Sequence, residues 1–181
     1  MHALVIGGTG MLKKVSVWLC NQGFYVSVIG RDRDRLEGVK HACNAPGNVT
    51  CISLDYHDSD ILKQSIKGAI KQNGPITLVI AWIHTTAKKA LQVICEEIEL
   101  HSKSYGLFHI LGSSASQLER QKIGSSSCDY HRILLGFILQ GEHSRWLSHE
   151  EIAEGVIAGI QSKQSDCIIG TLEPWELRPI H

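Results

Sequence analysis

The sequence predicts a single α/β domain, a Rossmann-type doubly wound parallel sheet of about six to seven strands with helices on both faces. Short apolar runs alternate with longer amphipathic stretches, which is the pattern of repeated strand–helix units. Several of these runs (LVI, TLVIA, ILLGFIL) are continuously apolar, as expected for parallel strands that are buried on both faces. The first run leads directly into a glycine-rich turn.

The apolar runs are the expected strands of this sheet. They cover residues 3–6, 25–29, 49–54, 76–82, 107–111, 132–139 and 167–170. Helices are expected between them, where apolar residues recur at helical spacing. They cover residues 10–22, 31–41, 59–72, 87–101 and 148–161. The last of these opens with Ser148 and Glu151, the two residues of a capping box.

The length of 181 residues fits one domain. We expect residues 1–171 to form a single NAD(P)-binding domain and residues 172–181 to form a C-terminal tail. Lys and Arg together number 18, as do Asp and Glu, so net charge gives no long-range attraction to nucleic acid or to an anionic membrane. The start of the chain lacks the pattern of a signal peptide, and no apolar stretch has the length of a membrane span. These features predict a cytoplasmic protein.

The six cysteines and ten histidines show no ligand spacing. No CxxC pair occurs, which argues against a zinc ribbon or a thioredoxin-like site, and no HExxH occurs. We therefore expect reduced cysteines and no metal site.

The glycine-rich turn follows the first strand and precedes the first helix. Its residues are Gly7, Gly8, Thr9, Gly10, Met11 and Leu12. Gly7 allows a tight turn, and Gly10 lets a pyrophosphate approach the backbone, where the helix presents free N–H groups and the positive end of its dipole. The spacing excludes a phosphate-binding GxxxxGK[ST] loop. The turn predicts a dinucleotide site; a turn without a ligand is the alternative.

Arg31 stands at the end of the second strand, within the sequence GRDR. An acidic side chain at this position would bind the ribose 2′-hydroxyl of NAD. A guanidinium suits the 2′-phosphate of NADP by its charge and its bidentate geometry. The sequence favours NADP as the cofactor, while the neighbouring Asp32 keeps NAD possible.

The segments VIGGTGML, VIGRDRDRLE and LDYHD resemble the short-chain dehydrogenase/reductase superfamily, in the form with a GxxGxxG turn. The resemblance implies that residues 7–12 line the pyrophosphate and that Arg31 faces the 2′-phosphate. It places Asp55 and Tyr56 at the adenine ring. It places Ala81, Trp82 and Ile83 where the family has its Asn-Asn-Ala-Gly segment, beside the cofactor ribose. It also places Ser113 at the active-site serine.

The sequence departs from this family in three places. Lys13 replaces the third glycine of the turn, the asparagine after the fourth strand is absent, and no YxxxK occurs. In the family this tyrosine donates the proton, and the lysine lowers its pKa. Only residues 114–131 separate the fifth and sixth expected strands, which leaves room for one or two helical turns around 116–122.

Two residues are candidates to replace the missing proton donor. His84 follows the fourth strand and can act as a general acid near neutral pH, and Ser113 can hydrogen-bond a substrate carbonyl. Each also fits an ordinary loop position. One hypothesis is therefore an NADP-dependent oxidoreductase with a non-standard proton donor. The alternative is a non-catalytic dinucleotide-binding protein, such as a redox sensor or a partner-binding module. A scaffold without cofactor follows if Lys13 spoils the turn.

The expected partners are few. An oxidoreductase would take a small-molecule substrate that the sequence does not identify, and a homodimer through the helix 87–101 is plausible.

Overall fold

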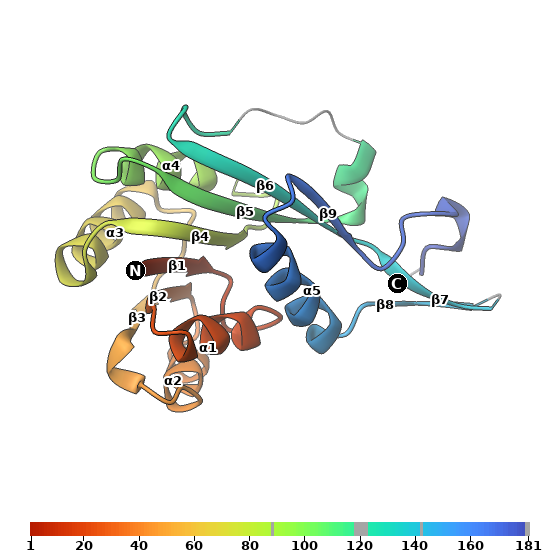
Figure 1. Cartoon of the computed structure of the whole chain (residues 1–181), viewed down its shortest axis with the longest axis horizontal. Coiled ribbons are helices and arrows are strands. Elements are labelled where there is room, and N and C mark those ends of the chain that lie inside the picture. The colour runs from red at the N-terminus through yellow and green to blue at the C-terminus, as the bar shows by residue number, and fades with distance from the viewer. Residues whose placement is uncertain (88, 118–122, 142, 180–181) are drawn as a thin grey trace.

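The computed structural model describes residues 1–87, 89–117, 123–141 and 143–179 of the chain. Its centre is a parallel seven-stranded sheet with the strand order β3-β2-β1-β4-β5-β6-β9 (Figure 1). The strands are β1 (His2–Ile6), β2 (Tyr25–Gly30), β3 (Val49–Ser53), β4 (Ile76–Trp82), β5 (Tyr105–Gly112), β6 (Cys128–Leu135) and β9 (Asp166–Ile169). The predicted fold class is confirmed.

Helices cover both faces of the sheet, so the domain has three layers (Figure 1). One face carries α1 (Lys13–Asn21), α2 (Arg33–His41) and α5 (His149–Ser162). The other carries α3 (Ser59–Asn73) and α4 (Ala90–Glu99). A short 3-10 helix, η1 (Pro46–Asn48), precedes β3. The side chains of β1 show why its run is continuously apolar: Val5 enters the core under α1, Leu4 and Ile6 enter the core under α3 and α4, and all three are fully buried.

The first helix begins later than predicted. It was expected from residue 10, but α1 starts at Lys13, because residues 7–12 form the turn that leaves β1. The helix expected from residue 87 likewise begins only at Ala90. The capping box of α5 is confirmed: Glu151 N–H donates to the Ser148 hydroxyl, and the Glu151 carboxylate accepts from Ser148 N–H.

The sixth strand does not continue to residue 139, so that prediction is wrong at its end. β6 ends at Leu135, and Phe137–Gln140 forms a separate strand, β7, which pairs antiparallel with β8 (His143–Trp146). The reason is a change of partner. Phe137 leaves the sheet and exchanges two backbone hydrogen bonds of 2.9 Å with Thr171. The β7–β8 hairpin was not predicted.

The connection between β5 and β6 contains the 3-10 helix η2 (Ser113–Gln117). The helical turns expected around 116–122 lie mostly outside the described residues, since only 116 and 117 fall within η2.

After β9 the chain packs against the hairpin through the 3-10 helix η3 (Trp175–Leu177). The guanidinium carbon of Arg178 lies 4.5 Å from the ring centre of Trp175 and 5.9 Å from that of Trp146. In the part of the chain that the structure describes, no helix has the length and apolar character needed to cross a bilayer.

Candidate functional site

The residues predicted to form the site all lie at the carboxyl ends of the strands. The glycine-rich turn follows β1, Arg31 follows β2, Asp55 lies two residues after β3, Trp82 ends β4 and Ser113 follows β5. From β1 the chain adds β2 and β3 on one side, and it then crosses back to add β4 on the other side of β1. The order of the strands therefore reverses between β1 and β4. Ligands of open parallel sheets bind at this topological switch point.

The turn takes its shape from its first two glycines. Gly7 has a φ of 77°, and a Cβ placed on it would lie 2.9 Å from the carbonyl oxygen of Trp82. A Cβ on Gly8 would lie 2.6 Å from Cγ1 of Val28 and 2.8 Å from the hydroxyl of Ser16 in α1. These contacts hold the turn against the ends of β2 and β4, and hold the start of α1 close to the sheet, although Lys13 replaces the third glycine.

Gly10 faces open space, unlike Gly7 and Gly8. A Cβ placed on Gly10 would meet no atom within 4 Å. The N-terminus of α1 beside it has no side-chain cap and no acidic residue in its first turn. By comparison, α2, α3 and α5 are capped by Asp32, Asp58 and Ser148, whereas α4, like α1, has no side-chain cap. Open space beside a helix N-terminus that has no side-chain cap fits a diphosphate.

The hydrophobic residues of the turn face inward. The Leu12 side chain is fully buried in the core, and Met11 packs partly against that core. Leu12 can therefore face a ligand only through its backbone.

Arg31 is the exposed cation at the end of β2, and no ion pair joins it to another described residue. Its acidic neighbour Asp32 is committed to α2: its carboxylate accepts from Arg35 N–H at 3.0 Å and lies 3.5 Å from Arg35 Nε. The side chain of Thr9 packs against Gly30, where a Cβ would lie 2.9 Å from its methyl group. The end of β2 thus presents a guanidinium next to the turn.

Asp55 is engaged by His57. Its Oδ1 accepts from His57 N–H at 3.1 Å and lies 2.6 Å from His57 Nδ1. The hydrogen bond from the His57 ring holds the pKa of Asp55 below its usual value, with smaller contributions from the His57 backbone and from the charge of Arg31. The adenine contact implied for Asp55 stays a prediction, and one carboxylate oxygen already has two protein donors.

The network continues from His57 into the loop after β4. His57 Nε2 lies 3.0 Å from the hydroxyl of Thr86, and that hydroxyl lies 3.0 Å from His84 Nδ1. Tyr56 adds a second link: its hydroxyl accepts from His84 N–H at 3.3 Å, and its ring stacks on His57 with centroids 5.3 Å apart. His57 and Thr86 were missed at the level of sequence. Only their place beside Asp55 and His84 hinted at them.

The two candidate catalytic residues leave neighbouring strands and have different surroundings. The hydrogen bonds of His84 run to Tyr56 and Thr86, toward the loop after β3. Ser113 begins η2 after β5 and is 6% exposed, whereas the next residue, Ser114, is exposed. His84 thus lies on the side of the edge nearer β3, and Ser113 lies on the side nearer β6.

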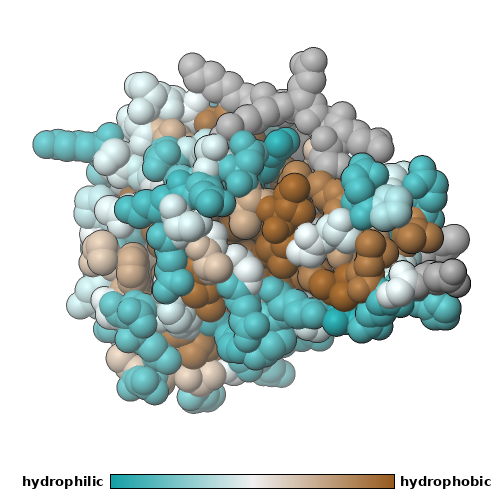
Figure 2. Space-filling model, turned by 45° about the vertical axis from the view of Figure 1, so that its right-hand side comes forward, coloured by the Kyte–Doolittle hydropathy of each residue, from teal (hydrophilic) through white to brown (hydrophobic). Residues whose placement is uncertain are grey.

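The Trp82 side chain lies between the glycine-rich turn and the end of β5. Its indole Cδ1 lies 3.4 Å from a Cβ placed on Gly7, and its Cη2 lies 4.0 Å from one placed on Gly112 at the end of β5. Ala81 before it is fully buried, and Ile83 after it is half-buried. Figure 2 turns the side of the molecule with η2 and the β7–β8 hairpin toward the viewer and shows hydrophobic surface lining a hollow there.

Solved structures of other proteins have the same architecture and identify the fold. A short-chain dehydrogenase/reductase from Serratia marcescens matches with a TM-score of 0.72 at 16% identity, over 93% of this chain and 96% of that one. An alcohol dehydrogenase from the archaeon Thermococcus sibiricus, complexed with 5-hydroxy-NADP, matches with a TM-score of 0.74 at 14% identity, over 99% of both chains. A metagenomic short-chain oxidoreductase in complex with NADP matches with a TM-score of 0.68 at 14% identity, over 94% of this chain and 97% of that one.

The chain has the short-chain dehydrogenase/reductase fold. The resemblance inferred from the first 60 residues is thereby confirmed at the level of the fold. No protein-family model matches the sequence, and no curated protein matches it.

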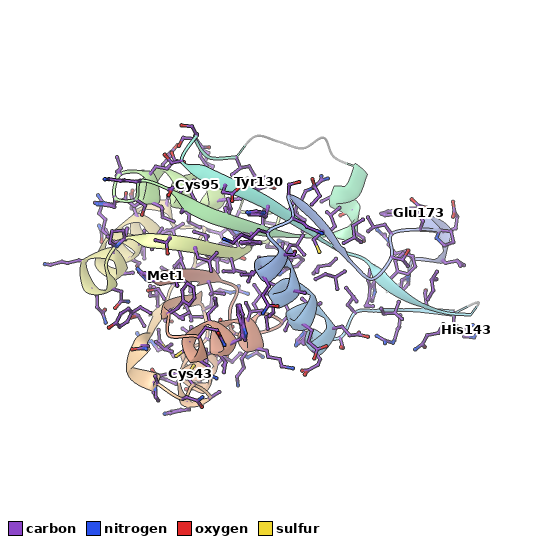
Figure 3. All side chains as sticks on the ribbon, in the orientation of Figure 1. Met1, Cys43, Cys95, Tyr130, His143 and Glu173 are labelled. Carbon is purple, nitrogen blue, oxygen red and sulfur yellow. The ribbon has the colours of Figure 1, made fainter. Side chains whose placement is uncertain are left out.

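Polar side chains lie on the α4 side of β5 and β6. They include Tyr130 of β6 (labelled in Figure 3) and His109 of β5, whose Nδ1 lies 3.0 Å from the Tyr130 hydroxyl. Burial lowers the pKa of His109 to about 4. Arg132, next on this face of β6, pairs with Asp166 of β9 at 2.7 Å. Tyr130 is therefore bonded to an imidazole whose lowered pKa keeps it neutral at pH 7.

Among the described residues, no cluster of three or more His, Cys, Asp or Glu side chains is arranged to hold a metal ion.

Proposed function

We propose that this chain binds NADP(H) across the carboxyl ends of β1 and β4 and acts as an oxidoreductase of the short-chain type. The observation that carries the proposal is the open space in front of Gly10, beside the uncapped N-terminus of α1. A diphosphate there would accept hydrogen bonds from backbone N–H groups, and the dipole of α1 would favour its negative charge. Gly7 and Gly8 hold the turn in the conformation that leaves this space open.

The side chains at the end of β2 favour NADP over NAD. Arg31 is exposed at the position where NAD-binding proteins carry an acidic residue, and the Asp32 carboxylate is occupied as the cap of α2. A guanidinium binds a phosphate in a bidentate manner, whereas it offers no comparable contact to the 2′-hydroxyl of NAD. Two proteins that share the fold are described as complexes with NADP or 5-hydroxy-NADP.

The nicotinamide half of the cofactor would lie beside Trp82, whose ring spans the space from Gly7 to Gly112. When bound, the nicotinamide supplies hydride transfer. A small substrate would enter the hydrophobic hollow between η2 and the β7–β8 hairpin (Figure 2). The hydroxyl of Ser113 would hydrogen-bond its carbonyl oxygen, and His84 would hold the proton. Thr86 would orient the His84 imidazole, and Tyr56 would hold the His84 backbone through its N–H.

Binding is tested with a substitution that fills the space without disturbing the fold. Gly10→Val puts a branched side chain where the structure has no neighbouring atom, so the protein should melt within about 2 °C of wild type. Its Kd for NADPH, measured by calorimetry, should rise at least about tenfold, which corresponds to about 1.4 kcal/mol. Gly47→Val is the matched control, because Gly47 also faces open space but lies in η1, before β3. Equal binding by both variants would contradict the proposal.

Catalysis is tested separately, by following NADPH consumption with aldehydes, ketones, quinones and flavins. The proposal predicts turnover of at least one class, and a loss of about 100-fold or more in kcat for His84→Ala, the usual contribution of a general acid. Ser113→Ala should lower kcat/KM by a similar factor. Turnover unchanged in both variants would contradict these two roles.

A second function is supported by two observations. The chain lacks YxxxK, and the hydrogen bonds of His84 tie it to the loop after β3. A protein that binds NADP(H) without consuming it, as a redox sensor or a partner-binding module, needs neither a free acid nor a catalytic tyrosine. Micromolar NADPH binding with no turnover across the four substrate classes would favour this function over the oxidoreductase.

A further inference from the structure

We propose that Asp55, His57 and Thr86 form a nucleophilic site that hydrolyses small activated esters. This activity is additional to the proposed reduction and needs no nucleotide. The observation that carries it is a row of carboxylate, imidazole and hydroxyl joined by contacts of 2.6 Å and 3.0 Å. Such a row supplies a hydroxyl nucleophile, the general base that activates it and the group that orients the base.

The ionised carboxylate determines where the hydrogens of this row lie. The hydrogen bond from the His57 ring holds the pKa of Asp55 below its usual value, so Asp55 is charged at neutral pH. A charged carboxylate only accepts hydrogen bonds, which assigns the ring hydrogen of a neutral His57 to Nδ1. Nε2 then has a lone pair 3.0 Å from Oγ of Thr86, and the Thr86 hydroxyl donates to it. His57 is thus in the tautomer that can take the hydroxyl proton.

The imidazole of His57 is held in place by two more contacts. Its backbone N–H donates to Oδ1 of Asp55 at 3.1 Å, which fixes the residue relative to the carboxylate. The ring of Tyr56 stacks on the imidazole with an interplanar angle of 28°. A base that is oriented before the reaction does not have to be ordered during it, which lowers the barrier to proton transfer.

The nucleophile is accessible and lies close in sequence to a helix N-terminus. Thr86 and His57 are exposed, so an ester can reach the hydroxyl without a change in the fold. Thr86 precedes the first residue of α4 by four positions, and α4 has no side-chain cap and no acidic residue in its first turn. The positive end of its dipole would favour the negative charge that develops on the attacked carbonyl oxygen.

A second histidine contacts the same hydroxyl. His84 Nδ1 lies 3.0 Å from Oγ of Thr86. In the described part of the chain no carboxylate pairs with His84, whereas Asp55 pairs with His57. Asp55 would stabilise the imidazolium that forms when His57 takes the proton, so the geometry selects His57 as the base.

The reaction takes place in two halves, and the only co-reactant is water. Oγ of Thr86 forms a bond to the acyl carbon while its proton moves to Nε2 of His57. The bond from the acyl carbon to the leaving oxygen breaks, and the leaving alcohol takes the proton from His57. Water then attacks the acyl-threonine and gives its proton to His57, which returns it to Oγ of Thr86. The products are one acid and one alcohol, and the protein is regenerated.

The experiment follows the hydrolysis of p-nitrophenyl acetate without nucleotide. Thr86→Ala and His57→Gln should each lower kcat/KM about 100-fold, the usual contribution of a general base and its nucleophile acting together. The double variant should lose no more than either single variant, because the two residues act as one unit. Thr86→Ser keeps a hydroxyl and should stay within about tenfold of wild type.

Two variants are matched controls. Thr85→Ala removes the exposed threonine next to Thr86, and His101→Gln removes an exposed histidine whose Nε2 lies 3.3 Å from a carboxylate oxygen of Glu97. Both should hydrolyse the ester at the wild-type rate. Thermal melting of every variant checks that the exposed substitutions leave the fold intact.

A second readout identifies the nucleophile. An alkyl fluorophosphonate forms a stable adduct with an activated hydroxyl, with loss of fluoride. Peptide mass spectrometry should place this adduct on Thr86 in wild type, and the adduct should be absent from His57→Gln. A bracing role of the network between two loops would not produce this labelling.

Four results would overturn the inference. They are hydrolysis no faster than with equimolar imidazole, an equal loss of rate in either control variant, an adduct on a histidine in place of Thr86, and a larger loss in His84→Gln than in His57→Gln. NADPH binding is measured independently of this assay, so the proposed function and the ester hydrolysis can each fail while the other stands.

Discussion

The two ends of the candidate site are built differently. Beside β1 and β2 the site is made of backbone: Gly7 and Gly8 fit against neighbouring strands, and Gly10 leaves an open space beside the start of α1, which has no side-chain cap. Beside β5 it depends on side chains, with Ser113 buried at the start of a 3-10 helix.

The difference shows that the dinucleotide cradle and proton transfer depend on different parts of a short-chain fold. A dinucleotide cradle needs one strand, one turn and one helix, and these 20 or so residues are complete here. Proton transfer in the resembling family needs a tyrosine and a lysine one helical turn apart, and the sequence between β5 and β6 contains no such pair. The proposed function therefore requires that cofactor binding be separable from the standard proton donor in this architecture.

The largest effect is expected from adding one methyl group to the glycine-rich turn, at the β1 end of the site. Gly7→Ala forces a side chain to adopt a φ of 77° and places its Cβ 2.9 Å from a carbonyl oxygen. We expect a loss of about 2–4 kcal/mol of unfolding free energy, together with loss of NADPH binding. Gly112→Ala is the matched control at the second end, where the nearest atom to the new Cβ is 4.0 Å away. A chemical denaturation in which both variants lose equal stability would contradict the contrast.

Acid should weaken the sheet between β5 and β6 through its buried histidine. The pKa of His109 is lowered to about 4 by burial, so the native protein binds this proton only near pH 4, whereas the unfolded chain binds it near pH 6.5. The unfolding free energy should therefore fall between about pH 6.5 and pH 4, by on the order of 2 kcal/mol from this residue. Denaturation at pH 7 and pH 4.5 measures it.

His2 contributes a loss of the same sign, because burial lowers its pKa while it bonds Gly74 and Ser27. The comparison of wild type with His109→Gln isolates the share of His109. If the variant loses as much stability on acidification as wild type does, His109 is not the group responsible.

Sequence alone predicted the end of the site that is set locally. The turn after β1 and the start of α1 lie within about ten residues, so their pattern carries the prediction. The β7–β8 hairpin was missed because Phe137 changes partner to Thr171, 34 residues away, and nothing in either local pattern shows this pairing. The contacts of Asp55 and His84 were missed for the same reason, since His57 and Thr86 come from two different loops.

A smaller effect is expected from the charge at the end of β2. Arg31→Ala should raise the Kd for NADPH about tenfold and leave that for NADH nearly unchanged, because only NADPH carries the phosphate. Arg33→Ala is the matched control, since Arg33 is an exposed arginine that directly follows the Asp32 cap at the start of α2. Unchanged selectivity in Arg31→Ala, measured by calorimetry, would remove the argument for NADP.

The smallest effect is expected away from both ends. Gly68 lies in the interior of α3, is exposed, and a Cβ there would meet no atom within 4 Å. Gly68→Ala should stabilise the protein by about 0.5–1 kcal/mol through helix propensity, with NADPH binding unchanged. A change in Kd for this variant would mean that altered stability alone affects binding, which would weaken the conclusions drawn from Gly7→Ala.

A crystal structure of the protein with NADPH tests the central claim most directly. The account predicts the diphosphate against the backbone of residues 7–12 and the start of α1, with the 2′-phosphate beside Arg31. A nucleotide bound elsewhere, or an empty turn at saturating NADPH, would contradict it.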